Sequence, residues 1–272
     1  PQSDIRVVSN VGIVGSGTNG TVVVSNATTL VDGAVVECIS AAANDQESWG
    51  IGVNIQRTGA SATATEAKMT ILIGGATDDV LIPDLICGYA VAGIQGAYSY
   101  FFPLHVPGGV RIAAFINSVR TSITARMMIH LYGGGVPPFR VGAKVDVLGT
   151  EINGARGQAV TPAESGGTAT VTEMVASSAY AYFALILGLQ PATDTSLATG
   201  SGVVNVGIGL GAATEERIGT WLFRRDAGED CSGPYPNLPA FRNVPAGTRI
   251  SLLASFNGTN DAANDGHIYA VR

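Results

Sequence analysis

The sequence contains few charged residues. Asp, Glu, Lys and Arg make up 13% of the 272 residues, about half of their usual share in soluble domains. Only two lysines are present, Lys68 and Lys144, the longest basic run is Arg224-Arg225, and the net charge is −6. Proteins that bind nucleic acid concentrate positive charge to neutralise phosphates, so we expect no direct binding to nucleic acid. The low charge also favours a homo-oligomer, in which neighbouring copies cover part of the surface.

Cysteines and long apolar runs are equally scarce. The three cysteines, Cys38, Cys87 and Cys231, form no C-x-x-C pair, which argues against a zinc site or a redox dithiol. Cys38 and Cys87 lie in apolar stretches, where a buried free thiol is expected. No apolar run reaches the ~18 residues of a membrane-spanning helix, and the N-terminus lacks the segments of a secretion signal. We therefore expect neither membrane insertion nor a signal peptide.

The abundant residues favour strands and tight turns. Glycine contributes 36 residues, and valine, threonine, serine and alanine are frequent. Large apolar residues alternate with small or polar ones in 49–56 and 69–75, which is the period of a half-buried strand. Turn signals recur about every 8–15 residues, as in antiparallel sandwiches,. Only 63–69 favours a short helix. The sequence therefore predicts an all-β protein with antiparallel β-sandwich, jelly-roll-like domains.

The chain contains two tandem copies of one module. Blocks of the first copy recur in the same order and at a nearly constant offset in the rest of the chain, and a Val-Pro-x-Gly-x-Arg-Ile motif recurs with them. The matched blocks are 5–20 with 139–154, 35–43 with 170–179, 49–56 with 183–190, 74–82 with 211–219, 105–115 with 243–253, and 127–133 with 266–272. The glycines and prolines of 133–138 form a short, stiff connection. We therefore predict two β-sandwich domains, 1–136 and 137–272.

One segment matches the phosphate-binding fingerprint G-x-G-x-x-G, from Gly15 to Gly20. A dinucleotide site needs a helix after these glycines, but β-branched residues follow here. The second copy has Glu151 at the position of the middle glycine and keeps only Asn153-Gly154, a hairpin-turn dipeptide,. We therefore interpret both segments as turns and expect no nucleotide or other cofactor.

Residues suited to catalysis are sparse. The histidines His105, His130 and His267 occur without a G-x-S-x-G elbow or an H-x-x-x-H spacing,, and we interpret them as ordinary surface or core residues. His130 and His267 lie on the last strand of each copy, in shifted register. The adjacent carboxylates Asp78-Asp79 and Glu215-Glu216 diverge in a predicted turn, which favours a solvated hairpin tip over a glycosidase pair. We therefore expect no enzyme and assign no catalytic residue.

Three other features carry groups that bind ligands in other proteins. The loop 257–266 offers oxygen atoms but lacks the spacing of a calcium loop, so we expect no metal. Arg111 and Arg249 follow Val-Pro-x-Gly-x in both copies; their guanidinium groups either bind turn carbonyls or share a ligand. Trp49, which aligns with a phenylalanine of the second copy, is expected in the core. That leaves Trp221 as the remaining aromatic platform, and the binding residues stay unassigned.

The two copies differ most just before the Val-Pro motif. The first copy has the aromatic stretch 98–102, and the second has the charged, proline-rich segment 223–243. Aromatic side chains are typical contact residues. We therefore predict that 98–102 is largely buried at a contact within or between domains, and that 223–243 is an exposed loop.

Part of the first copy resembles a module common in virion proteins of tailed bacteriophages. The blocks that carry this resemblance are 80–89, 98–115 and 127–134. It covers about 35–135, and the second copy follows it more loosely, with Gly219-Thr220 where the first has Ile82-Pro83. The resemblance implies a structural protein located in the virion, with other capsid or tail proteins as partners. It carries no catalytic motif.

The residues and the resemblance together predict a non-enzymatic structural component of a bacteriophage virion. Such a protein would decorate the capsid or the tail, stabilise the particle or present loops to the host. The alternative is a carbohydrate-binding module of a host-adhesion device, because aromatic residues on sandwich loops stack on sugar rings. Its partner would be a host surface glycan.

Overall fold

The chain is an all-β protein, which confirms the predicted fold class. The computed structural model describes residues 6–9, 20–58, 66–75, 77–87, 97–134, 136–149, 157–191, 202–212, 214–225, 231–233, 237–258 and 264–272. These residues form strands, turns and loops but no helix, so none of them forms a helix able to cross a membrane. The helix expected at 63–69 is wrong for Ala67–Met69, which begin a strand because their side chains are buried; the start of that segment lies outside the described residues.

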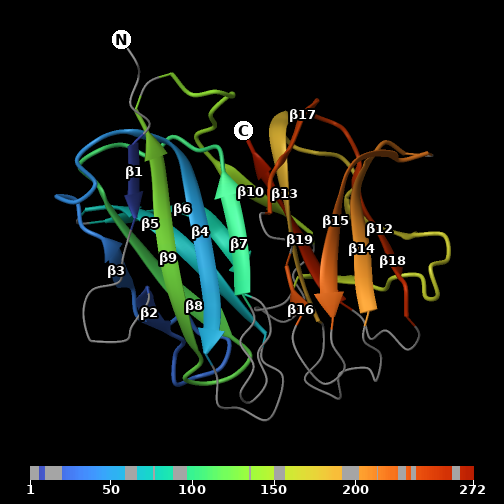
Figure 1. The fold of residues 1–272 in the computed structure, drawn as a ribbon, viewed down its shortest axis with the longest axis horizontal. Helices are drawn as coiled ribbons and strands as arrows, with labels where there is room; N and C mark the ends of the chain where they lie inside the picture. The colour runs from blue at the N-terminus through green and yellow to red at the C-terminus, as the bar shows by residue number, and fades with distance from the viewer. Residues whose placement is uncertain are drawn as a thin grey trace.

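The strands of residues 1–136, called the first half, form two antiparallel sheets (Figure 1). The first A-sheet has the order β1-β9-β4-β7, and β2 also pairs with β9. The first B-sheet has the order β3-β8-β5-β6. Their bounds are β1 Arg6–Ser9, β2 Thr21–Val24, β3 Val36–Ile39, β4 Ser48–Thr58, β5 Ala67–Gly74, β6 Asp78–Ile86, β7 Ala97–Phe102, β8 Arg111–Ser118 and β9 Thr124–Gly133.

The strands of residues 137–272, called the second half, repeat this arrangement. The second A-sheet has the order β10-β19-β13-β17, and β11 also pairs with β19; the second B-sheet has the order β12-β18-β14-β15-β16. Their bounds are β10 Val145–Leu148, β11 Gln158–Val160, β12 Thr170–Val175, β13 Tyr182–Pro191, β14 Gly202–Leu210, β15 Glu216–Arg225, β16 Cys231–Ser232, β17 Ala240–Val244, β18 Ile250–Phe256 and β19 Asn264–Val271. The two halves share the same strand order, except that the second B-sheet has one further strand, β16, at its edge.

Both B-sheets have a register shift at a corresponding place. In the first half, the register of β3 against β8 shifts after Glu37, and in the second half the register of β12 against β18 shifts after Glu173. These glutamates lie in the matched blocks 35–43 and 170–179. Strand pairing joins described residues of the two halves only at an isolated bridge between Leu104 and Gly142. The domain boundary at 136/137 itself stays a prediction.

The Val-Pro-x-Gly turns are held alike in both halves. Gly109 and Gly247 adopt positive φ angles of 75° and 82°, a conformation that favours glycine. The amide group of Asn44 donates to the carbonyls of Pro107 and Val110. At the corresponding place of the second half, the hydroxyl of Ser178 donates to the carbonyl of the second turn's proline. These small buried side chains, and not an arginine, bind the turn carbonyls.

Candidate functional site

The two halves meet in a buried interface centred on Tyr269. Strands β6 and β7 of the first half lie against the outer face of the second A-sheet; in Figure 1, β7 is the strand of the first A-sheet next to the second half. The hydroxyl of Tyr269 accepts the amide N–H of Ile86 at 2.7 Å and donates to the carbonyl of Asp84 at 3.0 Å. Rings of Tyr100 and Phe102 pack edge-on against Tyr269. The interface therefore combines ring packing with hydrogen bonds across the halves.

The stretch 98–102 supplies much of this interface. Tyr98 donates to the carbonyl of Leu189 in the second half at 2.7 Å, and Tyr100 donates to the carbonyl of Ile86 at 2.7 Å. Tyr98, Tyr100 and Phe102 are buried, whereas Phe101, on the opposite face of β7, is half-buried. The predicted burial of this stretch is therefore confirmed for the alternate rings, and the contact is within the chain.

Two titratable side chains are also buried at this interface. Lys68 is buried and its ammonium lies 3.3 Å from the carboxylate of Asp84. The imidazole of His267, also buried, has its Nδ1 3.4 Å from the carbonyl of Asp84. Burial, together with the positive charge of Lys68, lowers the pKa of His267 to about 4. His267 is therefore neutral at physiological pH.

The shifted register of the last strands is confirmed. His267 pairs with Gly188, and His130 pairs with Gly52. In the matched blocks 49–56 and 183–190, Gly52 aligns with Ile186, which pairs with Tyr269. His130 therefore corresponds to Tyr269 and not to His267, although a tyrosine follows two residues after each histidine.

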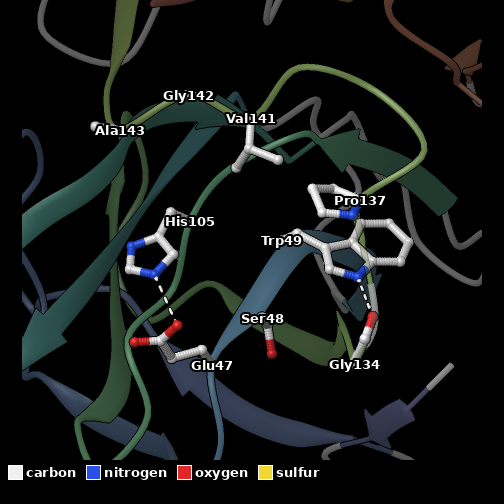
Figure 2. Close-up of a pocket in the computed structure, with 9 residues that line it drawn as sticks. All are labelled: Glu47, Ser48, Trp49, His105, Gly134, Pro137, Val141, Gly142 and Ala143. Atoms are coloured by element: carbon white, nitrogen blue, oxygen red, sulfur yellow. Dashed lines mark hydrogen bonds and ion pairs between the residues drawn. The ribbon is translucent and has the colours of Figure 1, made fainter. Parts of the chain in front are cut away.

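A cleft of about 610 Å³ lies where the two halves connect (Figure 2). Figure 2 shows His105 and Glu47 on one side of the cleft and Trp49 on the other. The imidazole Nε2 of His105 lies 3.7 Å from a carboxylate oxygen of Glu47, and both side chains are exposed, by 49% and 78%. Pro137 and Val141, from the connection between the halves, complete the apolar wall. The cleft thus offers an aromatic ring, an acid and an imidazole.

The structure reverses the expected roles of the two tryptophans. Trp49 is half-buried, and its indole N–H donates to the carbonyl of Gly134 at 3.0 Å while the ring lines the cleft. Trp221, expected as the free platform, is only 8% exposed and donates to the carbonyl of Leu238. The register of β4 against β9 shifts between Ser48 and Gly50, and this irregularity interrupts the alternation that predicted a core position for Trp49.

The half-buried rings of the first A-sheet continue from the cleft across its outer face. Trp49 packs against Tyr132 and Phe139, and Phe101 packs against the same two rings. Phe139 also stacks on Phe241 of the second half, which is 50% exposed. This surface joins the cleft to a second pocket of about 300 Å³ beside His130.

The repeated arginines bind carboxylates. Arg111 forms two hydrogen bonds with Asp78, and Arg249 binds Glu173 and Glu215. The interpretation as ties of turn carbonyls is wrong for Arg111; Arg249 reaches one carbonyl, of Gly211, at 3.4 Å. A carboxylate fits the donor fork of a guanidinium better than a single carbonyl does. The arginines therefore form hydrogen bonds with the acids at aligned positions in preference to turn carbonyls.

The acidic pairs are therefore not wholly solvated hairpin tips. The side chains of Asp78 and Glu215 are only 16% and 12% exposed because the arginines cover them. Their neighbours Asp79 and Glu216 are exposed, as expected. Sequence reasoning missed the pairing, although both partners stood at aligned positions in each copy.

Other candidate residues stay apart from the cleft. Cys38 and Cys87 are buried free thiols, as expected, and burial raises the pKa of each to about 12. Among the described residues, no three His, Cys, Asp or Glu side chains gather as metal ligands. Three candidate segments lie mostly or partly outside the described residues. They are the middle of the loop 257–266 and most of the two predicted turns, Gly15–Gly20 and Gly149–Gly154. The segment 223–243, expected as an exposed loop, is described only in part. The expectation is wrong for that part, which includes strands β16 and β17 and the buried residues Phe223 and Asn237.

No family model and no curated protein sequence matches the chain. Among solved structures it is similar to PNGF-II, at 8% identity over 98% of this chain, with a TM-score of 0.38; the chain spans 65% of the length of that protein. It is similar to the CBM22-1–CBM22-2 tandem domain of Xyn10C from Paenibacillus barcinonensis, at 9% identity over 99% and 93% of the two chains, with a TM-score of 0.31. A chain of Sulfolobus Turreted Icosahedral Virus follows, at 11% identity over 94% and 60%, with a TM-score of 0.26. Similarity at this level carries no argument about function.

Proposed function

We propose that the protein is a non-enzymatic structural component of a bacteriophage virion, which decorates the capsid or the tail. The observation that carries the proposal is the interface between the halves. Domain interfaces within a chain are commonly polar and allow relative motion. Here Tyr269 and Tyr100 are buried between the halves and hydrogen-bonded to the backbone of β6. Two equivalent sandwiches fixed as one body suit a building block of a shell, and the resemblance of the first copy to virion proteins supports the same role.

The proposal predicts that the protein is present in purified virus particles. Particles from the organism that produces this chain should contain it in many copies after washing at high salt, because a structural component is held by extensive contacts. Mass spectrometry would count the copies, and cryo-EM should show twin-sandwich density on the head or the tail. Recovery of the protein only from the particle-free fraction would refute the proposed role.

The cleft supports a second candidate function, the binding of a host surface glycan. Saccharide sites combine an aromatic ring, which packs against the C–H face of a sugar, with a few polar groups that bind hydroxyls. Trp49 supplies the ring, and Glu47 and His105 supply a carboxylate and an imidazole on the opposite side of the cleft. The platform of this site is therefore Trp49 instead of Trp221.

This candidate predicts binding to a glycan array of neutral and acidic oligosaccharides. Trp49→Ala and Glu47→Gln should each weaken that binding by about tenfold or more, because each removes a principal contact. Glu47 is 78% exposed, so its replacement leaves the fold intact even if Trp49→Ala disturbs it. Glu216→Gln, at an acid 61% exposed that does not line the cleft, is the matched control. An empty array, or equal binding by all variants, would contradict a glycan site here.

A further inference from the structure

The second A-sheet receives part of the first half at a specific site. Tyr269 lies over Gly188, where an added Cβ would come within 3.0 Å of the ring, and the same Cβ would lie 3.3 Å from the side chain of Ile86. The absence of a side chain at Gly188 therefore makes room for both. Ile86, at the end of edge strand β6, is fully buried there.

The first A-sheet carries a similar local arrangement. Tyr132 lies over Gly52, where an added Cβ would come within 3.2 Å of the ring, and His130 pairs with that glycine as His267 does with Gly188. These residues, together with Asn54, Ser99 and Leu238, line the pocket of about 300 Å³, which we call the first-sheet pocket. The arrangement that holds Ile86 thus recurs in the first half, two residues along the strand from the position that matches Gly188.

The burial of the surrounding residues shows that the site over Gly188 is covered by the first half, whereas the site over Gly52 is open. Strand β19 is buried at every position, because the first half covers its outer face. In its counterpart β9, buried and half-buried positions alternate strictly, and His130 and Tyr132 are on the half-buried face. Within the described chain, that face is covered only in part, and Leu238 of the second half, which lines the pocket, is itself 56% exposed.

The second half also has a counterpart of Ile86. Ile86 pairs with Lys68 in the first B-sheet, and Leu222 pairs with Asn205 in the second. Asn205 corresponds to Lys68 at the offset of the neighbouring matched blocks, 74–82 and 211–219. Leu222 therefore occupies the place of Ile86 in the repeated sheet. Whereas Ile86 is fully buried, Leu222 is 57% exposed. One chain thus carries an open pocket on its first half and an exposed apolar side chain of the matching kind on its second half.

We propose that these two surfaces bind each other between copies of the chain. Leu222 of one copy enters the first-sheet pocket of the next, over Gly52 and against Tyr132, in a contact similar to the one that Ile86 makes with Gly188 and Tyr269 within one copy. A contact between two different surfaces is head-to-tail and generates a ring or a filament. The inference names a partner for the proposed virion role and rests on that role for its biological setting. Its test needs only the purified chain, so either can fail without the other.

The test measures the oligomeric state of the full chain by sedimentation velocity over a wide range of concentration. The wild type should associate beyond a dimer as its concentration rises. Leu222→Arg removes the entering side chain, and Asn54→Arg fills the pocket; each should weaken self-association by about tenfold or more. Val171→Arg, at an apolar residue 47% exposed on the opposite edge strand of the second B-sheet, should associate as the wild type does.

Mixing the two variants gives the sharpest outcome. Leu222→Arg keeps an intact pocket and Asn54→Arg keeps an intact Leu222, so an equimolar mixture should form one-to-one dimers that grow no further. Matching circular dichroism and melting would show that the variants fold, and Ser99→Arg, on the neighbouring strand opposite Asn54, gives an independent block. A wild type that stays monomeric, a mixture that stays monomeric, or association that survives both substitutions would overturn the proposal.

Discussion

Truncation of Tyr269 to alanine is expected to lower the free energy of unfolding by about 3–5 kcal/mol. The side chain is fully buried between the halves, where it packs against Tyr100 and Phe102 and binds the backbone of β6. Its loss leaves a cavity and two backbone groups without their partner. Chemical denaturation of the full chain, followed by circular dichroism, measures the change, and a separate transition for each half would accompany a weakened interface.

Two further variants separate the contributions. Tyr269→Phe keeps the ring but leaves the N–H of Ile86 and the carbonyl of Asp84 without the hydroxyl, which should cost about 1–3 kcal/mol. Tyr132→Ala removes the ring that lies over Gly52 in the first half. That ring is half-buried, so its loss should cost clearly less than Tyr269→Ala. Equal losses at Tyr132 and Tyr269 would mean that the interface between the halves adds nothing special to stability.

Acidification is expected to destabilise the chain through His267. Burial lowers the pKa of this imidazole from 6.5 to about 4. Between these values the unfolded chain binds a proton that the folded chain excludes, so the free energy of unfolding falls as the pH falls through this window. The full loss is about 3 kcal/mol, since one pKa unit corresponds to about 1.4 kcal/mol. The nearby ammonium of Lys68 opposes protonation in the folded state, and Asp84 favours it.

Urea denaturation from neutral pH down to about pH 4 tests this expectation. His267→Asn removes the titrating group and should flatten the dependence of stability on pH across the window. His105→Asn alters an exposed imidazole of the cleft and should keep the wild-type dependence. If His267→Asn and the wild type lost stability in parallel, the proton uptake would have to occur at other groups.

The fold could be predicted because its signals are local and occur twice. Alternating apolar residues and Val-Pro-x-Gly turns each specify short strands and tight connections, and the alignment of the matched blocks agrees with the pairing. Ile51 lies opposite Phe102, and Leu185, its counterpart in the matched blocks 49–56 and 183–190, lies opposite Ala240. Register in a sandwich follows from which side chains face the core, and both copies keep that pattern.

The site could not be predicted to the same extent, because it depends on how one half packs against the other. Nothing local distinguishes Tyr132 from Tyr269, or Leu222 from Ile86, yet one member of each pair is buried between the halves. Trp49 was misplaced for a different reason. A single irregularity in the pairing of β4 re-aims the side chain,, and residue types in the strand do not encode that shift.

The place of β9 and β19 in their sheets has a consequence during synthesis on the ribosome. Each is the last strand of its half, yet each lies inside its A-sheet, where β9 joins β1 and β2 to β4, and β19 joins β10 and β11 to β13. A nascent chain that has not yet reached Asn264 therefore holds these second-half strands with unpaired edges, which invite aggregation. The first half passes through the same stage earlier, because its A-sheet lacks β9 until Thr124–Gly133 has been made. Chaperones that bind exposed strands should therefore be needed twice during translation, shortly before each of these last strands emerges.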